Sequence, residues 1–261
     1  MRHSGRARRD PGAMALVVLL AVLLAGAAAG FGYLAWQRQQ AADAVRAVER
    51  ESLPAVERAY DAPAENPIDF EALRRESPDV YAWLYVPNTN VNLPVLQRPG
   101  DDFFYLDHDR YGEPAVEGAV FSQMANATDF SDPVTVLYGH NIVNDAMFAT
   151  LHAYEDPAFF ADNPELYVYL PDRILAYEVV AAYEYDDRHI LNSFDFSDPA
   201  VRTGYFASVL APDDPKANVR DGAQLDADDR IVQLSTCRSA LTSDPVRYIV
   251  TAVLVGEKPA A

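Results

Sequence analysis

The single cysteine of the sequence, Cys237, is the first residue whose chemistry needs an explanation. It ends the apolar run IVQLSTC, which is typical of a strand, and a polar loop follows it. A lone cysteine excludes an intramolecular disulfide framework and a cysteine-based zinc site. The thiol is therefore a buried packing residue, half of a disulfide to a second chain, or a reactive group. Its place at the mouth of a strand favours a nucleophile, since only a partly exposed thiol can react.

A cysteine nucleophile needs a group that transfers protons and a donor that stabilises an oxyanion. Of the five histidines, His140 directly follows the predicted strand 134–138 and Gly139, a glycine that would let the backbone bend sharply. Arg247 lies ten residues after Cys237, at the start of the last predicted strand. If these two strands are antiparallel, Arg247 faces the thiol and its fixed donors can hold an oxyanion. A solvated loop histidine and an arginine paired with a surface acid are the plainer alternatives.

The elements that must position these side chains are mostly short strands. Strands are predicted at 80–86, 91–97, 118–123, 134–138, 166–170, 174–185, 230–236 and 247–255, with a hairpin around Pro171 and Asp172. Helices are predicted at 68–76, 146–154 and 198–210, the last with Asp198 as its N-cap and Pro199 as its first residue. This pattern predicts a mainly β fold: a closed or nearly closed barrel of about eight strands, with short helices.

The composition indicates a folded domain, and the net charge argues against one class of partner. Half of the 261 residues are hydrophobic and 11% are aromatic, which is enough to bury a sizeable core. The formal net charge of −18 argues against nucleic acid as a partner, because phosphate binding needs a basic face.

The N-terminal region predicts a membrane anchor. Residues 1–11 carry four arginines, and residues 12–36 are uncharged and almost wholly apolar, about 37 Å of helix. We expect residues 1–11 in the cytoplasm, a transmembrane helix at 12–36, a stalk at 37–67 and an extracellular domain at 68–261 of a single-pass cell-membrane protein. A cleaved secretory signal ending near Ala27–Ala29 is the alternative.

The sequence as a whole resembles the sortases, membrane-anchored cysteine transpeptidases of Gram-positive cell surfaces, and specifically their class B branch. The resemblance runs from about residue 68 to residue 255. The segments that carry it, in order, are IDFEAL, PDVYAWLYVPNTNVNLPVLQ, DFFYLDHDRYG, TVLYGHN, MFATL, and LSTC followed ten residues later by arginine. The predicted helix at 198–210 also fits the class B insertion.

This resemblance implies roles for particular residues. Cys237 would be the nucleophile, His140 the general acid and base, and Arg247 the clamp for oxyanion and substrate. Tyr138, Ser235, Thr236 and Asn92 would line the substrate groove, with Leu96 as an apolar wall. Two positions depart from the family pattern: Gln233 stands where a threonine is common, and Arg238 stands where class B members often carry an acid.

The implied reaction cleaves a C-terminal sorting motif of secreted proteins through a thioester acyl-enzyme. The protein would then be transferred to an amine of a peptidoglycan precursor or a pilin. Membrane lipid would be a further partner, and no metal or organic cofactor is expected. An L,D-transpeptidase is an alternative enzyme, but Ser235 and Thr236 stand where that family expects histidine and glycine. A papain-like peptidase would place its cysteine before its histidine. A membrane-anchored binding module without activity is the non-enzymatic alternative.

Overall fold

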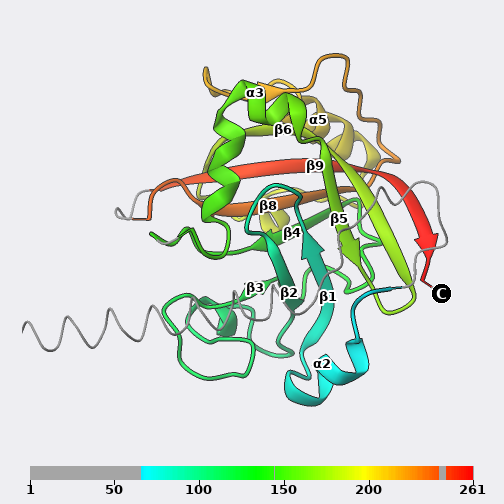
Figure 1. The fold of residues 1–261 in the computed structure, drawn as a ribbon. Helices are drawn as coiled ribbons and strands as arrows, with labels where there is room; N and C mark the ends of the chain where they lie inside the picture. Colours follow the sequence, from blue (N-terminus) through cyan, green and yellow to red (C-terminus); the bar gives the residue numbers. More distant parts are fainter. Residues whose placement is uncertain (1–65, 144, 241–244, 261) are drawn as a thin grey trace, which may run out of the picture. The chain divides into compact units, whose positions relative to one another are not determined.

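The computed structural model describes residues 66–260, with gaps at 144 and 241–244. Strands dominate this part of the chain (Figure 1). They are β1 (Val80–Tyr85), β2 (Asn92–Leu96), β3 (Val120–Phe121), β4 (Val134–Tyr138), β5 (Glu165–Tyr169), β6 (Arg173–Asp186), β7 (Asn218–Val219), β8 (Ile231–Cys237) and β9 (Val246–Pro259). The helices are α2 (Phe70–Glu76), α3 (Pro157–Asp162), α4 (Ile190–Ser193) and α5 (Pro199–Val209), with 3₁₀ turns η1 (Phe104–Leu106) and η2 (Ala149–Glu155).

Eight of the strands form a closed ring. They pair in the order β5-β1-β2-β3-β4-β8-β9-β6, and β6 pairs back onto β5. Strand β7 lies outside the ring and pairs only with β6 among the described strands. Closure removes the open sheet edges that unpaired strands would expose. The predicted eight-stranded β-barrel is confirmed.

The central strands are buried on both faces, which explains their nearly continuous apolar sequences. In β8, Val232 and Leu234 are fully buried. On the opposite face, Ile231 packs in a cluster with Val136 of β4 and with Phe206 of α5. Helix α5 therefore covers one face of the β4–β8–β9 region, and its predicted N-cap Asp198 accepts the Ala200 backbone N–H.

Gln233 lies beneath α5 and is fully buried. Its side-chain oxygen accepts a 2.8 Å hydrogen bond from the Tyr205 hydroxyl, and its amide donates to Thr251 Oγ1 at 3.1 Å and to the Tyr183 hydroxyl at 3.3 Å. Gln233, which departs from the family pattern, is thus the centre of a hydrogen-bonded network between α5 and the sheet in which its polar atoms have partners.

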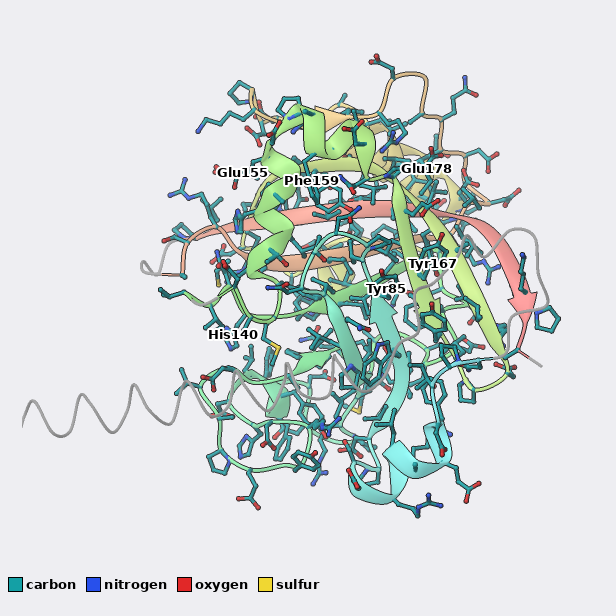
Figure 2. The ribbon with its side chains drawn as sticks, viewed as in Figure 1. Tyr85, His140, Glu155, Phe159, Tyr167 and Glu178 are labelled. Carbon is teal, nitrogen blue, oxygen red and sulfur yellow. The ribbon has the colours of Figure 1, made fainter. Side chains whose placement is uncertain are left out.

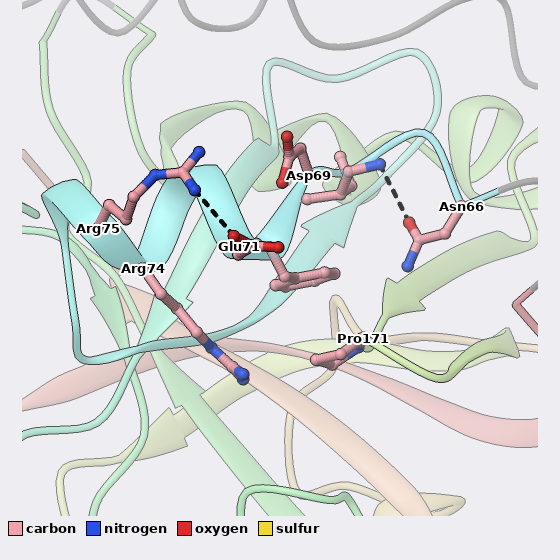
Figure 3. A pocket seen from close by; sticks show the side chains of 8 residues that line it. Asn66, Asp69, Glu71, Arg74, Arg75 and Pro171 are labelled. Carbon is pink, nitrogen blue, oxygen red and sulfur yellow. Dashed lines mark hydrogen bonds and ion pairs between the residues drawn. The ribbon is translucent and has the colours of Figure 1, made fainter.

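The first described residues are tied to the barrel by side chains. Asn66 donates to the Leu170 carbonyl at 2.7 Å and accepts the Ile68 backbone N–H at 3.1 Å. Asp69 caps α2 by accepting the Ala72 N–H, and Glu71 pairs with Arg75 on the helix surface (Figure 3). The predicted helix at 68–76 therefore begins two residues later than expected.

The other predicted helices and strands differ from the observed ones mainly in where they begin and end. The expected strand at 118–123 is reduced to the two residues of β3, and β9 extends four residues beyond the predicted 255. The helical turns expected at 146–154 are the 3₁₀ turn η2. Helices α3 and α4, turn η1 and strand β7 were not predicted.

The predicted transmembrane segment 12–36 and nearly all of the predicted stalk lie outside the described residues. Within the described part of the chain, no helix combines the length and the apolar character needed to cross a bilayer.

Candidate active site

The candidate site is built on one face of neighbouring strands. In the parallel β4–β8 pair, Tyr138 is the register partner of Ser235, and in the antiparallel β8–β9 pair Ser235 faces Ile249. Register partners, and residues two apart along a strand, present their side chains on the same face. Tyr138, Ser235, Cys237 and Ile249 therefore share the face that α5 covers farther along the sheet.

Cys237 and Arg247 are register partners in the β8–β9 ladder. The sequence-based expectation that Arg247 faces the thiol across antiparallel strands agrees with this register. Cys237 is the last residue of β8 and is half-buried. Its backbone is fixed by the ladder while its thiol remains accessible, which is the combination that a nucleophile needs.

His140 follows the end of β4 (Figure 2). Its Nε2 lies 2.7 Å from the Leu106 carbonyl oxygen. Because a carbonyl can only accept, Nε2 carries the proton in this contact, and Nδ1 is the ring nitrogen left for proton transfer. The His140 carbonyl in turn accepts the Phe148 backbone N–H at 2.9 Å, which fixes the backbone on the other side.

Gly139 is needed for close packing. Its φ lies outside the left-handed region, so the expected sharp bend is not the reason for the glycine. A Cβ atom at Gly139 would lie 2.8 Å from the Phe148 ring, closer than real Cβ contacts allow. The glycine lets Phe148 pack directly against the backbone that carries His140.

Cys237, His140 and Arg247 line one cavity of about 220 Å³. Tyr138, Ser235 and Thr236, all expected in the groove, line it too. The walls come from segments far apart in the sequence: Phe103 and Leu106 at η1, Phe121 and Gln123 at β3, and residues 185–190 at the end of β6. The Phe103 side chain is 59% exposed and Leu106 is 41% exposed, so the cavity has an apolar lip.

The polar groups of the cavity are held by specific partners. Burial, with a smaller contribution from the charge of Asp102, raises the pKa of Tyr138 to about 12, so its hydroxyl stays protonated. At the rim, a hydrogen bond from Arg188 lowers the pKa of Asp186. His189 Nε2 lies 2.5 Å from Gln123 Oε1 and connects two walls of the cavity.

Asn92 and Leu96 are not brought to the cavity. Asn92 Oδ1 accepts the Trp83 indole N–H at 2.6 Å, and Leu96 is fully buried in the core cluster beside Trp83 and Phe121. Strand β2 lies between β1 and β3 within the ring, so these side chains serve the barrel. Neither residue lines the cavity, and their roles in a substrate groove stay predictions.

Several residues that line the cavity were not predicted from the sequence: Phe103, Leu106, Phe121, Gln123 and His189. Leu106 and Phe103 belong to the segment DFFYLDHD, which carried part of the family resemblance but whose residues were given no role. The exposure of two large apolar side chains there is the structural signal of a binding surface. Within the described residues, no three side chains of the metal-binding types converge on a common point.

Comparisons with known proteins concern the family and the fold of this chain. The family model described as the sortase domain matches residues 84–255. The chain is 28% identical over 193 residues to sortase B of Listeria monocytogenes, covering 72% of this chain and 74% of the relative. It is 25% identical over 187 residues to sortase B of Staphylococcus aureus, covering 71% and 74%. The structure of sortase B from Clostridium perfringens superposes with a TM-score of 0.63 at 28% identity, covering 71% of this chain and 99% of that one.

Proposed function

The chain belongs to the sortase family, in its class B branch, and is a cysteine transpeptidase; we propose that Cys237, His140 and Arg247 carry out its chemistry. The observation that supports these roles most directly is the register of β8 and β9, which puts Arg247 opposite Cys237 in the cavity that His140 also lines. The family match decides against the L,D-transpeptidase and the inactive binding module.

In the proposed first half-reaction, the Cys237 thiol gives its proton to Nδ1 of His140, and the resulting thiolate sulfur attacks the carbonyl carbon of the scissile peptide bond in a sorting motif. The developing oxyanion is stabilised by the guanidinium of Arg247, whose planar donors keep their protons. The C–N bond then breaks, and His140 donates a proton from Nδ1 to the leaving amine. The product is a thioester between Cys237 and the secreted protein.

In the second half-reaction, an amine attacks the thioester carbonyl, and His140 accepts the proton that the amine loses. The C–S bond breaks and an amide forms. We propose that the amine belongs to a peptidoglycan precursor or a pilin, as the class B resemblance implies. The apolar lip at Phe103 and Leu106 fits the entrance for an extended peptide with apolar side chains.

The Cys237→Ala variant tests the covalent mechanism. The substitution removes the nucleophile and little volume, so it should fold normally and form no adduct. Wild type and variant would be offered a library of quenched fluorescent peptides with threonine before the cleavage site, with hydroxylamine as acceptor. In a parallel reaction without hydroxylamine, intact-mass spectrometry should show an acyl adduct on the wild type alone. Cleavage by Cys237→Ala above a few per cent of the wild-type rate would exclude the thioester route.

We also propose that the catalytic domain lies outside the cell membrane, anchored through residues 12–36. The support is the uncharged apolar run preceded by four arginines. Protease added to intact protoplasts should release the domain and leave a membrane-bound stub. A soluble mature protein trimmed near Ala27–Ala29 would instead identify the segment as a cleaved signal.

A further inference from the structure

The β4–β8 ladder ends just before the nucleophile. The last register pair is Tyr138 with Ser235, and the Gly139 backbone N–H donates to the Ser235 carbonyl at 3.2 Å. Carbonyls two residues apart on a strand point to the same side, so the Cys237 carbonyl is the next acceptor along this edge. Strand β4 has ended there and offers it no backbone N–H. An unpaired backbone carbonyl at this position would be costly and would leave the end of β8 loosely held.

Two side chains take the place of the missing strand. Asn141 Nδ2 donates to the Cys237 carbonyl oxygen at 3.0 Å, and His152 Nε2 lies 3.1 Å from the same oxygen. The two side chains also contact each other, with 3.0 Å between Asn141 Nδ2 and His152 Nε2. Asn141 directly follows His140 in the chain, so this contact joins the backbone of the general acid and base to that of the nucleophile.

His152 is itself held from two sides. Its Nδ1 lies 2.5 Å from Glu155 Oε1, one turn farther along η2, where Figure 2 labels Glu155. Its ring stacks on Tyr248 of β9 with 4.6 Å between ring centroids. Tyr248 is the register partner of Thr236, the residue before the nucleophile. Elements η2, β8 and β9 therefore meet behind Cys237.

Donors and acceptors around the His152 ring can be matched whether the ring is neutral or protonated. The Glu155 carboxylate accepts from Nδ1–H in both states. In the neutral ring, Nε2 accepts from Asn141, and the other amide hydrogen of Asn141 serves the Cys237 carbonyl. In the imidazolium, Nε2–H donates to the Cys237 carbonyl directly. The carbonyl has a donor in each case.

We propose that Asn141, His152 and Glu155 form a positioning cluster, which replaces the ended β4 ladder and holds the Cys237 peptide in place beside His140. The proposal rests on the proposed nucleophilic role of Cys237. None of the three residues lines the cavity, so they act on the reaction through the backbone of Cys237. Small displacements of a reacting group lower turnover steeply while leaving substrate binding nearly intact.

Two substitutions at His152 separate positioning from simple packing. In His152→Gln, the side-chain amide nitrogen stands three bonds from Cβ, as Nε2 does, and can still donate to the Cys237 carbonyl. In His152→Asn, the side-chain amide nitrogen stands only two bonds from Cβ, as Nδ1 does. It can therefore keep the contact with Glu155 but cannot reach the Cys237 carbonyl. With the best peptide from the fluorescent library, His152→Asn should lose roughly tenfold in kcat at an unchanged KM. His152→Gln should stay within about twofold of the wild type.

Hydrogen–deuterium exchange provides a readout that does not depend on any substrate. His152→Asn should raise exchange in segments 235–238 and 139–141 and leave the β5–β6 hairpin protected, while His152→Gln should match the wild type. Equal exchange and equal kcat in the two variants would overturn the proposal, as would a general rise in exchange with a lower Tm. Failure of the wild type to cleave any peptide would count against the proposed function, while the exchange result would still decide on the positioning cluster.

Discussion

At the scale of single residues, Arg247 and Arg238 flank the same connection between β8 and β9 but differ in their surroundings. Replacement by lysine should therefore affect them differently. Arg247 is paired in register with Cys237 and lines the cavity, whereas Arg238 is exposed and lies 3.5 Å from Glu184. An exposed ion pair contributes about 0–1 kcal/mol to stability, so a charge-conserving change at Arg238 should matter little. A planar donor fork at a developing oxyanion cannot be reproduced by an ammonium group.

We therefore expect Arg247→Lys to unfold at the wild-type Tm and to lose at least about tenfold in kcat. Removal of one oxyanion donor typically costs about 10²–10³ in turnover. Arg238→Lys is the matched control and should retain wild-type turnover. Steady-state kinetics with the library peptide and thermal unfolding of both variants check the prediction. Wild-type kcat in Arg247→Lys would remove the proposed role of this arginine.

At the same scale, Cys237, His140 and Arg247 were recognisable as candidates from the sequence because each lies at or next to the end of an apolar strand, and the family resemblance supplied their roles. Asn92 and Leu96 could not be judged in this way. Whether a side chain of β2 points to a groove or into the barrel depends on the strands β1 and β3 that flank it, and β3 comes from a distant part of the chain. Leu106 was missed for a similar reason, since only its fold-dependent contact with His140 shows its importance.

At the scale of elements, the turn after β4 depends on the space at Gly139. A methyl group there would lie 2.8 Å from the Phe148 ring, and Phe148 is fully buried and cannot move away. We expect Gly139→Ala to destabilise the fold by about 1–3 kcal/mol, as overpacking usually does. Because His140 is the next residue, kcat should fall by roughly tenfold as well.

Gly204 in α5 is the matched control for this substitution. A Cβ at Gly204 would meet nothing within 4 Å, and the residue lies in the interior of a helix. Gly204→Ala should therefore stabilise the protein by about 0.5–1 kcal/mol and leave kcat unchanged. Urea unfolding and steady-state kinetics measure both variants. Equal effects at the two glycines would contradict the packing argument.

There is also a physical reason why the longer strands could be predicted from the sequence. Strands such as β4 and β8 are buried on both faces, and their continuous apolar sequences are recognisable without knowledge of their neighbours. The two-residue strands β3 and β7 have too few residues to show a period. Their pairing depends on partners elsewhere in the chain, Val95 and Leu96 for β3 and Ala181 and Ala182 for β7.

At the scale of the whole molecule, buried phenols set a limit on alkaline stability. Burial raises the pKa of Tyr81, Tyr177, Tyr183 and Tyr205 above the usual value, and it raises the pKa of Tyr138 to about 12. In the unfolded chain these groups titrate near pH 10. Above that pH the unfolded chain loses protons that the folded chain keeps, so unfolding becomes more favourable as the pH rises.

We therefore expect the tyrosine contribution to stability to be fully present below about pH 10 and to decline as the pH rises toward the higher values of the folded state. The absorbance change of phenolate formation should coincide with loss of the near-ultraviolet circular dichroism signal. Complete phenolate formation near pH 10 with an intact fold would contradict this expectation.

The register of β8 and β9 has a consequence for how this enzyme can change over time. Cys237 and Arg247, the proposed nucleophile and oxyanion donor, are held opposite each other by backbone pairing along seven consecutive positions, from Ile231 with Val253 to Cys237 with Arg247. The number of residues that join the two strands does not enter this geometry. Insertions and deletions between Arg238 and Pro245 can therefore accumulate without separating thiol from guanidinium. Descendants of one ancestral chain could diversify this connection while inheriting the same chemistry.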